Sequence, residues 1–213
     1  MPGKIVIVDY GLGNLFSLQQ ACAHVGLQAS ITNAALDIER APAIILPGVG
    51  AFGTAMDTLR RLDLIEPLRD AAAAGKPLIG ICLGMQLFMS ESCEFGRHRG
   101  LDLIPGEVVR LPDGEHKVPQ VGWNQIFKAR PDWHDSPLQD ISQGEYMYFV
   151  HSFYCKPGDL AVTLATTRYG ETEFCSSVQR GNIFACQFHP ERSGPEGLKI
   201  YQALSREISS YAH

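Results

Sequence analysis

The sequence has little cysteine and no excess of positive charge. Its six cysteines include no Cys-x-x-Cys pair, and their spacing fits neither a disulfide framework nor a zinc site. Lysine and arginine number 18 against 23 aspartates and glutamates, so the net charge is −5. This balance excludes a protein whose main task is to bind nucleic-acid phosphates or an anionic membrane surface. We therefore expect no metal, no cofactor, and no nucleic-acid or membrane partner.

Long apolar segments are also missing. Residues 10–36 lack aspartate, glutamate, lysine and arginine, but asparagine and glutamine side chains interrupt them, and a membrane core does not tolerate these. The N-terminal residues reach Asp9 before an apolar stretch is long enough for a signal peptide. We expect a soluble, cytoplasmic protein with reduced cysteines. No repeat, low-complexity segment or linker divides the chain, so residues 1–213 are expected to form a single domain.

In the first half of the chain, short apolar strands alternate with glycine-rich turns and helices. Each turn follows directly on a strand, and the apolar residues after it fall at helical spacing. This alternation is typical of parallel strands joined by right-handed crossovers, which place ligand sites at the carboxyl ends of the strands. The strands are expected at 4–8, 43–46 and 77–81, and the helices at 15–25, 52–62, 65–74 and 83–90.

The second half is rich in strands. Glycine, proline and aspartate separate most of them, which predicts hairpins or meanders, and a last helix is expected at 194–209. The predicted fold class is therefore α/β, with an open, mostly parallel central sheet flanked by helices and an antiparallel extension in the second half. The strands of this half are expected at 107–111, 121–127, 146–153, 160–167, 173–178 and 182–188.

The strongest local signal for chemistry is Gly80-Ile81-Cys82-Leu83-Gly84, between a buried strand and a helix. It has the form of a nucleophile elbow with cysteine in place of serine. The tight turn exposes the sulfur, the helix N-terminus favours the thiolate, and the Leu83 backbone N–H points to where an oxyanion forms. The alternative is a buried structural cysteine at an ordinary strand-to-helix turn.

A cysteine nucleophile needs a base, and among seven histidines only His189 has suitable neighbours. It lies in Phe188-His189-Pro190-Glu191, directly after a strand. Pro190 keeps His189 extended, and residues two apart in an extended chain point the same way, so Glu191 can orient the imidazole toward Cys82. The alternative is a capping histidine beside a solvated glutamate.

The turn Pro47-Gly48-Val49-Gly50 follows another buried strand. Two glycines around one valine allow a backbone N–H to point into a site, as an oxyanion hole requires, or allow a peptide to flip between two states. Without a partner motif the segment indicates only a turn.

Together, Gly80–Gln86 and Phe188–Glu191 resemble the motifs of the class I, or triad, glutamine amidotransferases. Within that class, four further segments resemble the glutaminase subunits of imidazole glycerol phosphate synthases (HisH family). The resemblance covers nearly the whole chain, and the order of the segments makes it specific. These segments are Asp9–Leu15, Pro47–Phe52, Val118–Asn124 and Tyr148–Ser152.

The resemblance implies a role for each matching residue. Cys82 attacks the side-chain amide of glutamine, His189 moves the protons, and Glu191 orients His189. The oxyanion hole is formed by backbone of Val49, Gly50 and Leu83. Glutamine is held by Gln86, Glu94, Ser152 and Phe153. The partner subunit is faced by Asn14, Trp123, Tyr148 and Arg192. For the last group the alternatives are core packing of the two aromatic residues and a solvated charge at Arg192.

Because the glutaminase motifs account for the whole sequence, we expect no segment for a synthase that uses the ammonia. The resemblance implies a separate (β/α)8 synthase subunit that forms a heterodimer with this chain and makes imidazole glycerol phosphate in histidine biosynthesis. Because free ammonia is protonated and lost to solvent, we expect low activity without this partner.

Two departures from the family pattern keep other interpretations open. Gln120-Val121 stands where His-Met is usual, and Arg192 where lysine is common. A paralogous glutaminase that supplies another synthase, such as one amidating a nucleotide sugar for surface polysaccharide, is the second hypothesis. A non-catalytic regulatory subunit on the same fold and a thiol hydrolase of γ-glutamyl peptides are the others.

Overall fold

The first half of the chain alternates strands and helices. The computed structural model describes residues 4–114 and 116–211. In chain order the elements of this half are β1 (Ile5–Val8), α1 (Leu15–His24), β2 (Ala29–Thr32), α2 (Ala35–Arg40), β3 (Ile44–Leu46), α3 (Phe52–Arg61), α4 (Ile65–Ala73), β4 (Leu78–Ile81), α5 (Leu83–Leu87), β5 (Met89–Ser92) and β6 (His98–Arg99).

The second half consists mainly of strands and ends in a long helix. It contains β7 (Ile104–Arg110), β8 (Gln120–Gln125), β9 (Phe127–Lys128), β10 (Tyr146–His151), β11 (Phe153–Pro157), the 3-10 helix η1 (Leu160–Val162), β12 (Thr163–Tyr169), β13 (Thr172–Arg180), β14 (Ile183–Cys186), the 3-10 helix η2 (Pro190–Arg192) and α6 (Gly194–Tyr211).

One large sheet runs through the molecule in the order β2-β1-β3-β4-β14-β13-β11-β7-β5-β6, with β12 beside β13 and β9 beside β12. The strands from β2 to β14 are parallel, and β13, β11 and β7 continue the sheet in antiparallel pairs. β8 and β10 form a second, two-stranded antiparallel sheet. The predicted fold class, a mostly parallel central sheet with an antiparallel extension, is confirmed.

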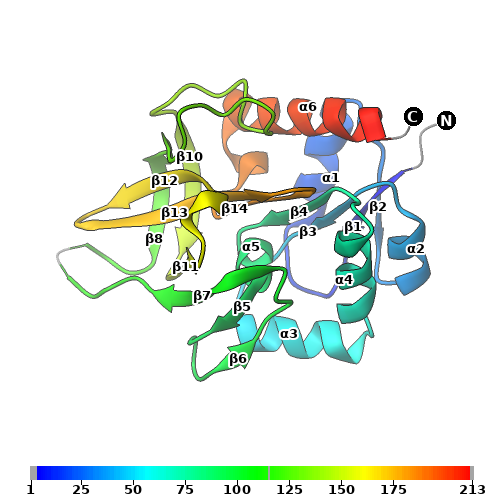
Figure 1. Cartoon of the computed structure of the whole chain (residues 1–213), viewed down its shortest axis with the longest axis horizontal. Helices are drawn as coiled ribbons and strands as arrows, with labels where there is room; N and C mark the ends of the chain where they lie inside the picture. The colour runs from blue at the N-terminus through cyan, green and yellow to red at the C-terminus, as the bar shows by residue number, and fades with distance from the viewer. Residues whose placement is uncertain (1–3, 115, 212–213) are drawn as a thin grey trace.

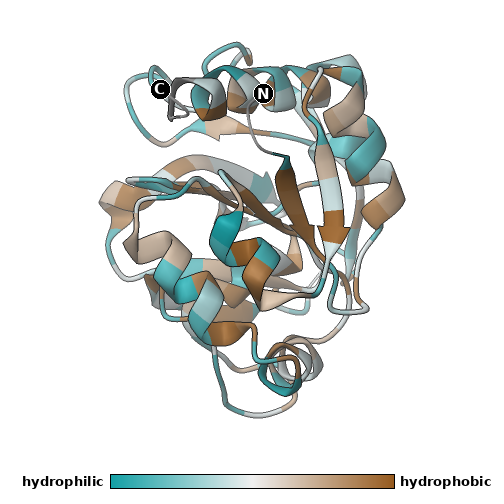
Figure 2. Cartoon of the chain, turned by 90° about the vertical axis from the view of Figure 1, so that its right-hand side faces the viewer, coloured by the Kyte–Doolittle hydropathy of each residue, from teal (hydrophilic) through white to brown (hydrophobic). Residues whose placement is uncertain are grey.

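Helices cover both faces of the parallel part of the sheet (Figure 1). α1 and α6 lie on one face, and α3 and α4 lie on the other. Side chains alternate between the two faces of a strand. Ile5 and Ile7 therefore pack in the cluster that includes α1 and α6 residues, whereas Val6 and Val8 pack in the cluster that includes α3 and α4 residues. Figure 2 shows the resulting apolar strands between helices that turn hydrophilic residues outward.

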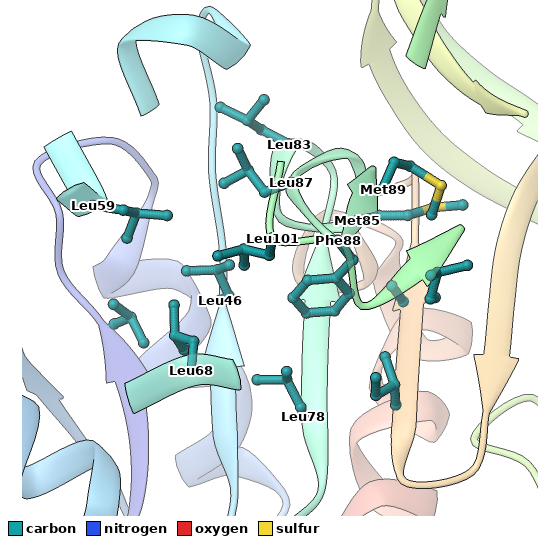
Figure 3. Close-up of a cluster of buried hydrophobic side chains, with 14 of the residues drawn as sticks. Leu46, Leu59, Leu68, Leu78, Leu83, Met85, Leu87, Phe88, Met89 and Leu101 are labelled. Carbon is teal, nitrogen blue, oxygen red and sulfur yellow. The ribbon is translucent and has the colours of Figure 1, made fainter. Parts of the chain in front are cut away.

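The helix after Cys82 is itself part of the core. All residues of α5 are buried, and Leu83, Met85 and Leu87 pack in one cluster with Leu46 of β3 and Leu78 of β4 (Figure 3). Burial on every side fixes this short helix against the sheet. The backbone at Cys82 is therefore held between two rigid elements.

The structure corrects several predicted boundaries. β2 and α2 were not predicted, because β2 is only half-buried and α2 is a short helix with one buried residue, Ile38, so neither has a clear apolar pattern. The helix expected at 83–90 ends at Leu87, and its last residues belong to β5. The strand expected at 146–153 is broken at Ser152, where the chain passes from the small sheet to the large one. The strand expected at 160–167 begins as η1.

Within the described residues, no helix is both long and apolar enough to span a bilayer.

Candidate active site

Cys82 occupies the sharp turn between β4 and α5. Its backbone has φ 53° and ψ −108°, in a region that residues with a side chain rarely adopt. The adjacent glycines permit this turn: a Cβ at Gly84 would lie 1.8 Å from the Leu46 carbonyl oxygen, and one at Gly80 would lie 2.7 Å from the Phe88 ring. Such a strained turn at the carboxyl end of a strand is the geometry of a nucleophile elbow.

His189 and Glu191 reach the same edge of the sheet from β14. β14 is the parallel neighbour of β4, and the Cys82 N–H donates to the Cys186 carbonyl over 2.8 Å. His189 is extended, with φ −105° and ψ 95°, and its Nδ1 lies 2.8 Å from Oε1 of Glu191. The extended chain expected from the sequence stops there: Glu191 lies in η2, and the turn of this 3-10 helix brings the two side chains together.

The electrostatics of the pair favour a charged imidazole. Burial lowers the pKa of His189, but the interactions with Cys82 and with Glu191 outweigh it and raise the pKa to about 10. A carboxylate can only accept, so Nδ1 carries a proton toward Glu191, whose side chain is 1% exposed. Nε2 is buried and has no hydrogen-bond partner among the described residues. The arrangement thus favours the charged form of His189 beside the sulfur of Cys82.

A cleft of about 550 Å³ opens beside Cys82. It brings together backbone and side chains that the sequence placed in separate motifs, from the turns after β3 and β4 and from the break between β10 and β11. A cleft of this size accommodates an amino acid. Its lining includes these candidate residues: Val49, Gly50, Cys82, Leu83, Gln86, Glu94, Ser152, Phe153 and Arg192.

The backbone donor expected for an oxyanion is occupied. The Leu83 N–H donates to the Gly48 carbonyl over 3.4 Å. Gly50 has φ 97°, a value that favours glycine, and lies in the exposed part of the turn. The buried Tyr10 hydroxyl donates to the Pro47 carbonyl over 2.6 Å and holds the base of the turn. The loop is thus buried and hydrogen-bonded at Pro47 and Gly48, and exposed at Val49 and Gly50.

Two polar side chains of the cleft wall are held from within the protein. Gln86 Nε2 donates to the Phe153 carbonyl over 2.9 Å, and Glu94 Oε2 accepts the Phe52 N–H at the start of α3 over 2.6 Å. Both side chains are buried. The Oε1 atoms of Gln86 and Glu94 therefore remain able to accept a hydrogen bond from a ligand.

Gln187 lies at this site although the sequence did not predict it there. Its Nε2 lies 3.5 Å from Cys82 Sγ, and its Oε1 lies 3.0 Å from Gln86 Nε2. A signal was available, because the strand expected at 182–188 contains Gln187, two residues before His189, and residues two apart in a strand share a face. In the structure the chain bends at residues 187 and 188, directly after β14. The sequence does not show that β14 is the neighbour of β4, so it could not connect Gln187 with Cys82.

The candidate partner residues form an exposed aromatic cluster, with one exception. Trp123 is 55% exposed, and its ring lies 6.2 Å from that of Tyr148. The guanidinium of Arg192 lies over the Tyr148 ring at 4.4 Å, a cation–π contact. The alternative of core packing is therefore wrong for Trp123, whereas Tyr148 is half-buried. Arg192 is exposed, as its alternative of a solvated charge expects, and it contacts the Tyr148 ring in addition. Asn14 does not line the cleft; it caps α1, and its side chain accepts the Ser17 N–H.

No group of three or more metal-ligating side chains is found within residues 4–114 and 116–211. The polar side chains that line the cleft carry a thiol (Cys82), an amide (Gln86), a carboxylate (Glu94), an imidazole (His151), a hydroxyl (Ser152) and a guanidinium (Arg192).

Comparison with known proteins agrees with this chemistry. The family described as "Glutamine amidotransferase class-I" matches residues 6–205. A protein of Moorella thermoacetica named "Imidazole glycerol phosphate synthase subunit HisH" is 48% identical over 212 residues, which cover 98% of this chain and 99% of the relative. Proteins of the same name from Syntrophotalea carbinolica and Chlorobaculum tepidum are 48% and 42% identical, each over 92% of this chain and 96% of the relative.

Solved structures share the fold at lower identity. "Structure of PurLQS from Thermotoga maritima" matches with a TM-score of 0.73 and 21% identity, over 98% of this chain and 100% of that one. The structure titled "Trypanosoma brucei CTPS - glutaminase domain with bound acivicin" matches with a TM-score of 0.70 and 15% identity, over 98% of this chain and 94% of that one. At these identities the likeness supports the fold alone.

Proposed function

This chain belongs to the class I glutamine amidotransferase family, and we propose that it is the glutaminase subunit of an imidazole glycerol phosphate synthase. It hydrolyses glutamine to glutamate and ammonia and passes the ammonia to a separate cyclase subunit in histidine biosynthesis. The observation that carries the catalytic assignment is the buried His189–Glu191 pair, 2.8 Å apart, beside Cys82 at the strained elbow. We also propose the cytoplasm as its location, because a reactive thiol requires a reducing compartment.

In the proposed reaction the Cys82 thiolate attacks the side-chain amide carbon of glutamine. The S–C bond forms, the C–N bond breaks, and His189 gives its proton to the departing nitrogen, which leaves as ammonia. Neutral His189 then takes a proton from water, and the hydroxide attacks the thioester. The C–S bond breaks, glutamate leaves, and the thiolate–imidazolium pair is restored. Glu191 holds the imidazole in orientation and stabilises its charge.

The oxyanion of each step needs backbone donors that the loop does not yet offer. Leu83 N–H is bonded to the Gly48 carbonyl, so that carbonyl must move away before the N–H can serve an oxyanion. A flip of the peptide between Gly48 and Val49 moves this carbonyl and turns the Val49 N–H toward the site as a second donor. Val49 and Gly50 lie in the exposed tip of the loop, where a docked partner can contact them.

The partner surface favours the histidine pathway over the paralogue. Gln120, one of the two departures from the family pattern, is 2% exposed and thus faces the interior. Arg192 places its cation on the Tyr148 ring, a contact that lysine also makes. Val121, which is 60% exposed, changes the side chain that the surface presents. With HisH relatives at 42 to 48% identity, the nucleotide-sugar alternative has little support.

The test of this function is glutamate release with and without the cyclase subunit of the same organism. The isolated chain is expected to hydrolyse glutamine slowly, and an equimolar cyclase subunit is expected to accelerate it by about 10²-fold, the typical effect of one oxyanion donor.

Three other results would contradict the proposal. Full activity of the isolated chain contradicts the control by the partner. Hydrolysis of γ-glutamyl peptides without hydrolysis of glutamine identifies a different thiol hydrolase. No hydrolysis in either state identifies a non-catalytic subunit.

A further inference from the structure

Gln187 lies at the centre of the catalytic site, although none of the steps above uses it. It is completely buried, and it follows β14 directly, two residues before His189. Its two amide atoms bond to the side chains of Cys82 and Gln86, so it connects the nucleophile to the wall of the cleft. A buried amide is retained at such a position only if its hydrogen bonds are satisfied, and here both ends are.

The direction of this amide is fixed by its neighbours. The Phe153 carbonyl can only accept, so the group of Gln86 that faces it must be Nε2. That same Nε2 faces Gln187, whose nearer atom must therefore be the acceptor Oε1. The remaining atom, Nε2 of Gln187, is thus the one directed at the sulfur, 3.5 Å away.

We propose that Gln187 is a positioning residue that presents a fixed N–H to the sulfur of Cys82 and favours its thiolate form. The proposal rests on the proposed function of Cys82 as nucleophile. A donor stabilises the anion more than the thiol, because hydrogen bonds to charged groups are about twice as strong as neutral ones. The Val150 carbonyl lies 3.9 Å from the sulfur and can only accept a hydrogen bond, so this contact suits the thiol form. The Gln187 amide thus favours the thiolate, whereas the Val150 carbonyl favours the thiol.

The chain of bonds also links substrate binding to the nucleophile. Phe153 belongs to the wall proposed to hold glutamine, and its carbonyl accepts a hydrogen bond from Gln86. Gln86 in turn donates to Gln187, and Gln187 donates to the sulfur of Cys82. A shift of the Phe153 backbone is therefore expected to change the hydrogen bond that Gln187 donates to the sulfur.

The test is the pH dependence of Cys82 alkylation by iodoacetamide in the isolated chain, measured on the Cys82 peptide by mass spectrometry. The exposed thiol of Cys93 gives an internal reference in every sample. In Gln187→Leu the midpoint is expected to rise by about one pH unit, so that alkylation below the midpoint is about tenfold slower. Gln187→Glu, which puts a negative charge near the sulfur, is expected to raise it further.

A second variant tests the orientation without changing Gln187. In Gln86→Glu the new carboxylate can only accept, so the Gln187 amide must turn its Nε2 away from the sulfur, and the midpoint is again expected to rise. The matched control is Gln120→Leu, because Gln120 is a buried glutamine with no hydrogen-bond partner among the described residues. Its Cys82 midpoint is expected to stay at the wild-type value.

The proposal is overturned if the folded Gln187 and Gln86 variants keep the wild-type midpoint, or if Gln120→Leu shifts it equally. Thermal unfolding identifies which variants are folded. This outcome is separate from a failure of the proposed function, which would appear as missing glutamine hydrolysis in the wild-type complex and not in the alkylation profile.

Discussion

Replacing Cys82 by alanine is expected to reduce glutamine hydrolysis to background, a loss of about 10⁴-fold or more. The sulfur forms the thioester, and no other cysteine is among the residues that line the cleft. Glutamate release by the complex with the cyclase subunit measures the loss. With added ammonium the same complex is expected to keep making product, because the cyclase then no longer needs this site.

Two further variants control this prediction. Cys82→Ser is expected to be as inactive as Cys82→Ala, because a serine hydroxyl ionises far less readily than a thiol and is the weaker nucleophile. Cys93→Ala removes an exposed thiol outside the cleft and is expected to retain activity. Glutamine hydrolysis that survives in purified Cys82→Ala would show that the mechanism is wrong.

Replacing His189 by alanine is expected to cost about 10³-fold or more in glutamine hydrolysis. His189 carries the proton to the departing ammonia, and no other imidazole among the described residues is paired with a carboxylate. Glu191→Gln is expected to be milder, because it perturbs the orientation and charge of the imidazole but leaves the proton carrier in place.

The two variants also differ in their pH dependence. Glu191 is one of the two residues whose interactions raise the pKa of His189 to about 10, so Glu191→Gln lowers this pKa. The alkaline limb of kcat/KM reports the acid of the free enzyme and is therefore expected to move to lower pH in Glu191→Gln. A limb that stays in place, or a larger loss in Glu191→Gln than in His189→Ala, would contradict the assigned roles.

The residues that touch each other through local chain geometry could be predicted from the sequence. Gly80 and Gly84 around Cys82 have one purpose in a strand-to-helix turn, which is to let backbone approach closely, and a Cβ at either position does clash. Glu191 lies close to His189 in the chain, so their contact followed from the spacing even though the turn that creates it is a 3-10 helix. The alternation of strands, turns and helices likewise indicated the parallel sheet.

Features that depend on contacts between distant segments could not be predicted. The contact of Gln187 with Cys82 requires β14 to be the neighbour of β4, and the strand order is not encoded in any local pattern. The bond between Leu83 and the Gly48 carbonyl depends on the relative position of two turns. The break at Ser152 was hidden because apolar residues continue across it, although the chain changes sheets there.

The central claim is tested most directly by trapping the covalent intermediate. The complex with the cyclase subunit is mixed with glutamine, quenched in acid within the first turnovers, digested and analysed by mass spectrometry. We predict a glutamyl group on the peptide that contains Cys82, absent without glutamine and absent in Cys82→Ala. An active complex that carries no glutamyl group during turnover, or carries it on Cys93 instead, would contradict the account.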